Sequence, residues 1–162
     1  MKGDKKVIEY LNKGLKSELT AINQYFLHSR MLEDWGVTKL AKHEYDESIE
    51  EMHHADKFIK RILFLEGVPN LQQLDKLYIG ETVKEIIECD LKAELEARDL
   101  YMEAAAYSAS INDYVSHDLF KEILTDEEGH VDHLETQLEM IEQMGIDKYI
   151  QLQSSPVTEQ EG

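Results

Sequence analysis

Leu15-Lys16-Ser17-Glu18-Leu19-Thr20-Ala21, followed by Tyr25, decides the fold of this chain, because it recurs as Leu91-Lys92-Ala93-Glu94-Leu95-Glu96-Ala97, followed by Tyr101. Each residue of the first copy lies 76 positions before its counterpart, as Glu18 and Glu94 show. Both copies place an acid where the helical pattern calls for a core residue. The chain is therefore built from two related halves.

A second motif obeys the same offset. Glu51-x-x-His54 recurs as Glu127-x-x-His130, again 76 positions later. Each half thus supplies one Glu and one Glu-x-x-His. This is the ligand set of a carboxylate-bridged dinuclear metal site inside a four-helix bundle.

The spacing of apolar residues predicts an all-α protein with four long helices and a short fifth helix at the C-terminal end. Thr38 is expected to cap the second helix, and Thr82-x-x-Glu85 reads as a capping box that starts the third. The stripe of the first helix is expected to bury Phe26. The tail after Ser154 is expected to be loose. The first, second, fourth and fifth predicted helices cover about 5–34, 39–66, 116–144 and 147–153, and the third starts at the capping box and frays near Asn112 and Asp113.

Connection lengths predict the topology. Helices one and two are joined by a few residues, as are helices three and four, so each pair forms an antiparallel hairpin. Roughly a dozen residues, up to Gly80, separate the two hairpins, which is enough to cross the bundle. The repeat then becomes a pseudo-twofold axis.

Six residues are expected to meet on that axis. Residues three apart on a helix face the same way within roughly 60°, so Glu51 and His54 can bind one ion, as can Glu127 and His130. A lone Glu-x-x-His is common by chance, but two of them with Glu18 and Glu94 at one offset are not. Four unpaired carboxylates in a core would cost several kcal/mol each. Two divalent cations would balance their charge.

The donor set favours iron. Hard oxygens with one imidazole per metal suit iron, manganese or zinc, whereas a structural zinc site is normally closed by Cys and His. Tyr25 and Tyr101, each seven residues beyond a candidate Glu, could hydrogen-bond to the ligands or donate electrons. The alternative for both is an ordinary core tyrosine.

Composition excludes several classes of function. The 34 acidic and 17 basic residues give a net charge of −17, which repels nucleic acid and anionic membranes and attracts cations. The single Cys89 excludes an intramolecular disulfide and cysteine-based metal clusters. The chain shows no signal peptide and no run of 18 apolar residues, so we expect a cytoplasmic protein without nucleic-acid or membrane partners.

The chain resembles the bacterioferritins over nearly its full length. Characteristic runs are Ala21-Ile22-Asn23-Gln24-Tyr25-Phe26-Leu27-His28, Arg61-Ile62-Leu63-Phe64-Leu65-Glu66-Gly67 and Asp126-Glu127-Glu128-Gly129-His130, together with Met1-Lys2-Gly3-Asp4. The resemblance implies one ferritin-like domain over residues 1–162 and a hollow shell of 24 subunits, built from twofold dimers, that stores ferric mineral. It also implies a ferroxidase centre with two Fe ions per subunit, bridged by Glu51 and Glu127, that oxidises Fe(II) with O2 or H2O2.

The resemblance further implies haem b between pairs of subunits, held by Met52 from each, and a ferredoxin or reductase as partner for iron release. Relatives often carry His near position 46 and Asp at position 50 as an inner-surface iron site. Here Asp46 and Glu50 are both carboxylates, four apart on one helix face. The remaining histidines match no ligand pattern and are expected to be solvated or at interfaces, with His133 on the opposite side of its helix from His130.

Two alternatives remain open from the sequence. One is a diiron peroxidase of the rubrerythrin type, against which stands the lack of the Cys-x-x-Cys pairs of a rubredoxin module. The other is a haem electron carrier whose bundle metals are only structural.

Overall fold

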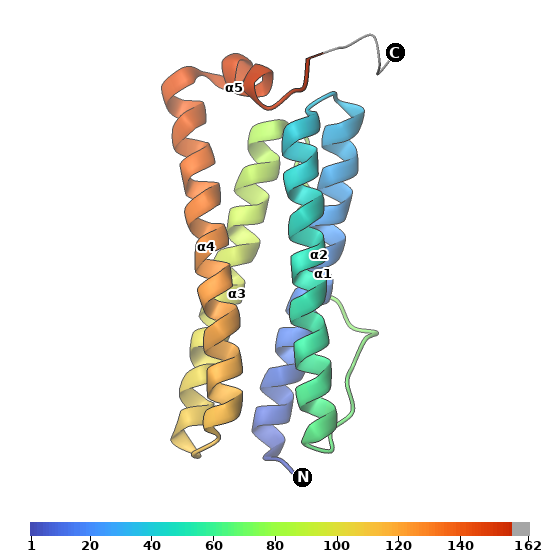
Figure 1. Ribbon diagram of the computed structural model, residues 1–162, viewed down its shortest axis with the longest axis vertical. Coiled ribbons are helices and arrows are strands. Elements are labelled where there is room, and N and C mark those ends of the chain that lie inside the picture. The colour runs from blue at the N-terminus through green and yellow to red at the C-terminus, as the bar shows by residue number, and fades with distance from the viewer. Residues whose placement is uncertain (157–162) are drawn as a thin grey trace.

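Four long helices form an antiparallel bundle in the computed structural model, which describes residues 1–156 (Figure 1). The expected tail lies, from residue 157 onward, outside these residues. The helices are α1 (Lys5–Asp34), α2 (Thr38–Phe64), α3 (Val83–Ser110), α4 (Tyr114–Met144) and α5 (Ile146–Leu152). The predicted all-α fold is confirmed, and none of the described helices is long and apolar enough to cross a membrane.

The hairpin topology is also confirmed. α1 packs along α2, α3 packs along α4, and the hairpins meet mainly through α1 and α3. The segment between α2 and α3 runs back along the outside of the bundle, and α5 lies across one end of it (Figure 1). There the backbone N–H of Lys39 donates to the carbonyl of Gln153 at 2.9 Å.

Helix caps explain where the predicted boundaries were wrong. Thr38 is the first residue of α2 and does not cap it; its hydroxyl instead accepts the backbone N–H of Ser155 at 3.0 Å. Thr82 caps α3 as predicted, but Glu85 reaches back to the N–H of Glu81. α4 begins at Tyr114, two residues early, because the Asp113 carboxylate accepts the N–H of Ser116.

Two apolar clusters occupy the two ends of the bundle. The larger includes Leu11, Phe58 and Phe120, and the other includes Leu32 and Ile87. Phe26, expected in the core, is 45% exposed. The buried face of α1 runs through Leu11, Glu18 and Tyr25, and Phe26, the residue after Tyr25, lies about 100° around the helix from it. The six predicted metal ligands lie between the clusters.

Candidate metal centre

All six predicted ligands converge in the layer between the two clusters. Each is buried: the exposed fractions run from 1% for Glu18 to 7% for His130. Their oxygen and nitrogen atoms form two groups, in each of which the atoms lie within 4.8 Å of one another. The groups are Glu18, Glu51, His54 and Glu127, and Glu51, Glu94, Glu127 and His130. Glu51 and Glu127 belong to both groups, where bridging ligands would be.

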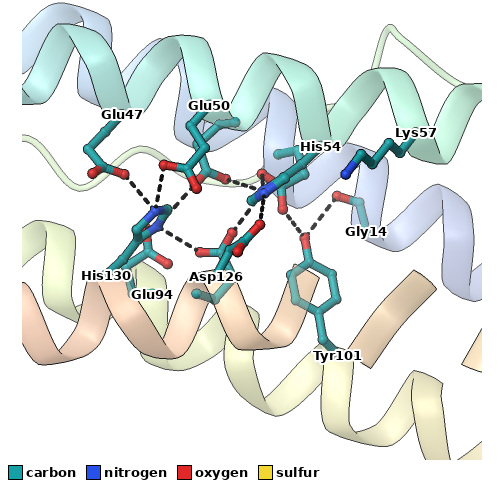
Figure 2. Close-up of polar contacts among 12 residues, drawn as sticks. Gly14, Glu47, Glu50, His54, Lys57, Glu94, Tyr101, Asp126 and His130 are labelled. Atoms are coloured by element: carbon teal, nitrogen blue, oxygen red, sulfur yellow. Dashed lines mark hydrogen bonds and ion pairs between the residues drawn. The ribbon is translucent and has the colours of Figure 1, made fainter. Parts of the chain in front are cut away.

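The two imidazoles are oriented by acids from the opposite half of the chain. His54 Nε2 donates to Asp126 Oδ2 at 2.9 Å, and His130 Nε2 donates to Glu50 Oε2 at 3.1 Å. Glu50 and Asp126 are themselves 76 positions apart. Because Nε2 carries the proton, Nδ1 of each ring points its lone pair at the other ligands (Figure 2).

Two tyrosines hold the two outer glutamates in the same reciprocal way. Tyr25 of α1 donates to Glu94 Oε1 at 2.5 Å, and Tyr101 of α3 donates to Glu18 Oε1 at 2.6 Å. Both phenols are almost completely buried. Each hydrogen bond leaves the second oxygen of its glutamate free to face the centre.

One atom of every predicted ligand lacks a hydrogen bond. These six atoms are Glu18 Oε2, Glu51 Oε1, His54 Nδ1, Glu94 Oε2, Glu127 Oε1 and His130 Nδ1. They are close together: His54 Nδ1 lies 3.2 Å from Glu127 Oε1, and His130 Nδ1 lies 3.2 Å from Glu51 Oε1. Buried polar atoms without partners are rare in native proteins and indicate a bound ion or water. The donor set therefore fits two cations.

Electrostatics points to the same need for positive charge. Burial lowers the pKa of His54, but the neighbouring carboxylates of Glu127 and Glu51 outweigh burial and raise it to about 11. The pKa of His130 is likewise raised, against burial, by Glu127 and Glu47. Burial and then the charge of Glu127 raise the pKa of Glu94. Protons thus compensate the carboxylates when cations are absent, and cations must displace them.

A narrow cavity of about 90 Å³ connects the centre with the segment between α2 and α3. Small side chains of α1 and α3, such as Ser17, Ala21 and Ala97, line its walls. Glu51, Glu94 and Glu127 lie at its inner end. A cavity of this size holds several waters, so ions have a path to the ligands.

Two of the other predicted site residues, Met52 and Asp46, lie outside this layer. Met52 is 51% exposed on α2. Asp46 is paired with Lys42 at 2.9 Å and joins none of the described groups of possible metal ligands, whereas Glu50 joins two of them. Asp46 and Glu50 occur together in none of these groups among the described residues, so the inner-surface iron site stays a prediction.

Two expectations about histidines were wrong. His28 is fully buried, not solvated, and its Nδ1 donates to Asp90 Oδ1 at 2.9 Å. His133 does not lie opposite His130; residues three apart on a helix share a face, and its ring stacks on that of His43 in α2.

Sequence reasoning missed the acids behind the ligands. Asp126 could have been found, because the offset of 76 relates it to Glu50. Glu47, whose Oε2 lies 2.7 Å from His130 Nε2, could not, since its counterpart is Ile123. The repeat gives no signal for a contact that only one half makes.

Known proteins resemble this chain closely. The family described as a ferritin-like domain matches residues 8–144. The bacterioferritin of Brucella melitensis is 56% identical over 161 residues, covering 99% of this chain and all of that protein. The bacterioferritin of Rhodobacter capsulatus is 56% identical over 157 residues, covering 97% and 98%. A solved structure of the Rhodobacter capsulatus bacterioferritin matches this fold with a TM-score of 0.96 and covers 97% of this chain and 98% of that chain. That structure is described as having a metal-free dinuclear site and haem iron in a crystallographic special position.

Proposed function

The chain belongs to the bacterioferritin family of ferritin-like proteins, and on that premise we propose that it stores iron and oxidises Fe(II) at the six-residue centre. It would act as a ferroxidase, an Fe(II):oxygen oxidoreductase, whose single domain spans residues 1–162. One observation carries this proposal: each of six buried ligands presents one atom without a hydrogen bond to a common space.

The chemistry follows from charge and electron counting. Four carboxylates with two neutral imidazoles balance two divalent ions, so two Fe(II) substrates bind together more favourably than one. Each Fe(II) gives up one electron on becoming Fe(III). The pair therefore reduces one H2O2 with two protons to two waters, or one O2 with two protons to H2O2.

The side chains of this chain hold the substrate ions in place. Glu51 and Glu127 would bridge them, Glu18 with His54 would bind one, and Glu94 with His130 would bind the other. Tyr25 and Tyr101 orient the outer glutamates, while Asp126 and Glu50 fix the imidazoles with Nδ1 inward. Partners of this kind typically contribute 10- to 100-fold to metal affinity, in order of magnitude.

Haem b would bind on the outer face of the α1–α2 hairpin. Met52 and Tyr45 are seven residues apart on one side of α2, and the Tyr45 ring lies 6.4 Å from that of Phe26. All three side chains are more than a third exposed, which is an apolar strip that fits a porphyrin. Met52 would hold the haem iron through its thioether, and Met52 of a twofold-related partner would supply another. Bound haem supplies one-electron redox chemistry.

The family premise extends the proposal to assembly and partners. Twofold dimers would form a cytoplasmic shell of 24 subunits with one haem per dimer, and the oxidised iron would grow as mineral inside. Asp46 and Glu50 would be candidates for iron binding on the inner surface. A ferredoxin or reductase would return electrons for iron release.

Mixing metal-free protein with Fe(II) in air tests the function. We expect ferric absorbance to grow well beyond two irons per chain, faster than in protein-free buffer. Arrest at two irons would indicate a centre that only serves another reaction, such as peroxide reduction. If ferric absorbance grows no faster than in protein-free buffer, the protein is not a ferroxidase, and the alternative of a haem electron carrier is favoured.

Two variants test the ligand set. Glu18→Ala and Glu94→Ala each remove one outer ligand and should slow oxidation at least tenfold. Glu88→Ala, an exposed acid on α3 outside the cavity, is the matched control and should oxidise Fe(II) at the wild-type rate. Wild-type rates in either ligand variant would refute the assignment.

A further inference from the structure

A second buried cluster of polar side chains lies one helix turn from the six-residue centre. Asp90 of α3 comes four residues before Glu94, and His28 of α1 comes three residues after Tyr25. Glu44 of α2 completes the cluster, because one polar atom from each of the three residues lies within 4.8 Å of the others. The side chains of Glu44, His28 and Asp90 are all at most 1% exposed.

The fold does not require charge at this position. At the offset of 76, the counterparts of Glu44, Asp90 and His28 are Phe120, Gly14 and Ala104. Phe120 and Ala104 belong to the larger apolar cluster, and Gly14 is buried beside them. The other half of the chain thus packs the related level with small and apolar residues. Because buried acids cost free energy where apolar residues would serve, the cluster needs a role of its own.

The imidazole of His28 is neutral in this cluster. Its Nδ1 donates to Asp90 Oδ1 at 2.9 Å, while its Nε2 accepts the backbone N–H of Gly80 at 3.1 Å. An imidazolium carries a proton on both nitrogens and could not accept that N–H. The ring therefore supplies no positive charge to the two acids, and it has no lone pair left for an ion.

The two carboxyl groups must therefore balance each other. Glu44 Oε2 and Asp90 Oδ2 are both buried, and neither has a hydrogen-bond partner among the described residues. The other titratable groups facing Glu44 are Glu47 on α2, Glu94 on α3, Tyr25 on α1 and Tyr149 on α5, none of which can be a cation. Burial, and then the charge of Asp90, raise the pKa of Glu44 well above its usual range, which favours the protonated carboxyl group.

We propose that Glu44 and Asp90 share one proton, and that Glu44 is thereby a positioning residue for the wall of the cavity that leads to the centre. A proton on Glu44 Oε2 that is donated to Asp90 Oδ2 gives both atoms a partner and leaves one negative charge on the pair. The other oxygen of Asp90 accepts hydrogen bonds from Gln24 and His28.

The shared proton acts on the connection between α2 and α3 through these two side chains. His28 accepts the N–H of Gly80, and Gln24 accepts the N–H of Tyr78. Gln24 and Tyr78 both line the cavity. If Glu44 lost its proton, two negative charges would meet in the core. The His28 ring could compensate them only by taking a proton at Nε2, which would release Gly80.

Infrared spectroscopy of the metal-free assembly in D2O at neutral pH tests the proton. We expect the wild type to show the carbonyl band of a buried carboxylic acid that is missing from Glu44→Gln. The Gln side chain has nearly the same shape and can also donate to Asp90, so this variant should fold. Glu88→Gln, the same substitution at an exposed acid of α3, should keep the band. If wild type and Glu44→Gln give the same spectrum, Glu44 is ionised and the proposal is wrong.

Amide hydrogen exchange tests the positioning role. Rates at Tyr78 and Gly80 are divided by those of the unfolded chain and compared between pH 6 and pH 9. An acid whose pKa is raised in the folded chain stabilises the fold less as the pH rises toward that pKa. Protection in the wild type should therefore fall at least tenfold relative to Glu44→Gln, whose amide does not ionise.

The comparison of the two pH profiles decides the role of Glu44. Parallel profiles in wild type and Glu44→Gln would mean that Glu44 only fills space, and would overturn the positioning role. Neither the infrared band nor the exchange rates involve iron, so their outcome is independent of the proposed ferroxidase activity.

Discussion

At the scale of single residues, the two tyrosines are equivalent in bonding and different in surroundings. Tyr101 packs on Phe58 and Phe120, with ring centroids 5.7 and 6.3 Å away. Burial and the charges of Glu94, Asp90 and Glu44 raise the pKa of Tyr25. Both nevertheless donate to an outer glutamate, so the two tyrosines orient their glutamates in the same way.

Replacing either tyrosine should therefore weaken metal binding to a similar degree. Tyr25→Phe and Tyr101→Phe leave Glu94 or Glu18 without its buried donor, and we expect each to lower Co(II) affinity about tenfold. Calorimetric titration of the metal-free protein measures this loss. Tyr107→Phe removes an exposed hydrogen bond to Asp4 and should leave affinity unchanged. An effect confined to Tyr25→Phe would contradict the equivalence.

At the scale of elements, a buried network fastens the long connection between α2 and α3 to the bundle. Side chains one turn apart on α1 accept backbone N–H groups of this connection: Thr20 from Asp75, Gln24 from Tyr78, and His28 from Gly80. Asp90 of α3 accepts hydrogen bonds from both Gln24 and His28. It thereby fixes the amide orientation and the imidazole tautomer that those contacts require.

Asp90→Ala should loosen this connection selectively. It leaves two buried donors unpaired, which costs about 2–4 kcal/mol. Amide hydrogen exchange at Tyr78 and Gly80 should accelerate at least tenfold, measured by mass spectrometry of the segment. Asp99→Ala, an exposed acid on the same helix, should not change it. Unaltered exchange at Gly80 would mean that Asp90 does not position His28.

The start of α4 offers a pH-dependent test. Burial alone would raise the pKa of Asp113, but hydrogen bonds from Ser116 and the charge of Arg61 outweigh burial and lower it. Because the pKa of Asp113 is lower in the folded chain than in the unfolded chain, its ionised carboxylate stabilises the fold at pH values above the unfolded pKa of about 3.9. This contribution is lost as the pH falls through the pKa of the folded chain.

Asp113→Ala should cost about 1 kcal/mol at pH 7, the usual value of such a cap. The difference in free energy of unfolding should shrink as pH falls below about 4. Urea denaturation at pH 7 and pH 3 measures both values. Asp118→Ala, an exposed acid in the same helix, controls for loss of charge. A difference that persists undiminished at pH 3 would contradict the cap.

At the scale of the molecule, an acidic layer lies between two apolar clusters. Those clusters bury enough apolar surface to tolerate four carboxylates in one plane of the bundle. In metal-free protein, protons must compensate the charge of these neighbouring carboxylates. Ions that bind only the folded chain must stabilise it.

Adding Co(II) should therefore raise the midpoint of thermal unfolding. Ligand at 100 times its Kd adds about 2.7 kcal/mol per site, which is several degrees for a chain of this size. Scanning calorimetry with and without Co(II) measures the shift, and a chelator should reverse it. A double variant, Glu51→Ala with Glu127→Ala, should lose most of it. A full shift in that variant would place the stabilising ions elsewhere.

A substitution at Met52 can test haem binding by the whole assembly without disturbing its folding. Met52→Leu keeps an apolar side chain but removes the thioether, so we expect the haem absorbance of the particle to disappear while its size is unchanged. Met102→Leu, another exposed methionine, is the matched control and should keep its haem. Visible spectra combined with light scattering give both readings. Haem retained in the Met52 variant would exclude this residue as the axial ligand.

The sequence by itself determined the four helices, their pairing and the six converging side chains. Helical period and a fixed offset between two related halves specify which residues share a level across a twofold axis, as Glu51 and Glu127 do. Even Asp126 could be deduced from Glu50 in this way. Helix ends were less certain, because Thr38 and Asp113 both have capping side chains and only one of them caps its helix.

Only the tertiary structure decided the contacts that one half makes without the other. Glu47 against His130, the stack of His43 on His133, and Asp90 between Gln24 and His28 have apolar or unrelated counterparts in the repeat. Such contacts depend on where side chains of different helices point once the hairpins have docked. No periodicity within one helix carries that information, because it is set by the distances between helices.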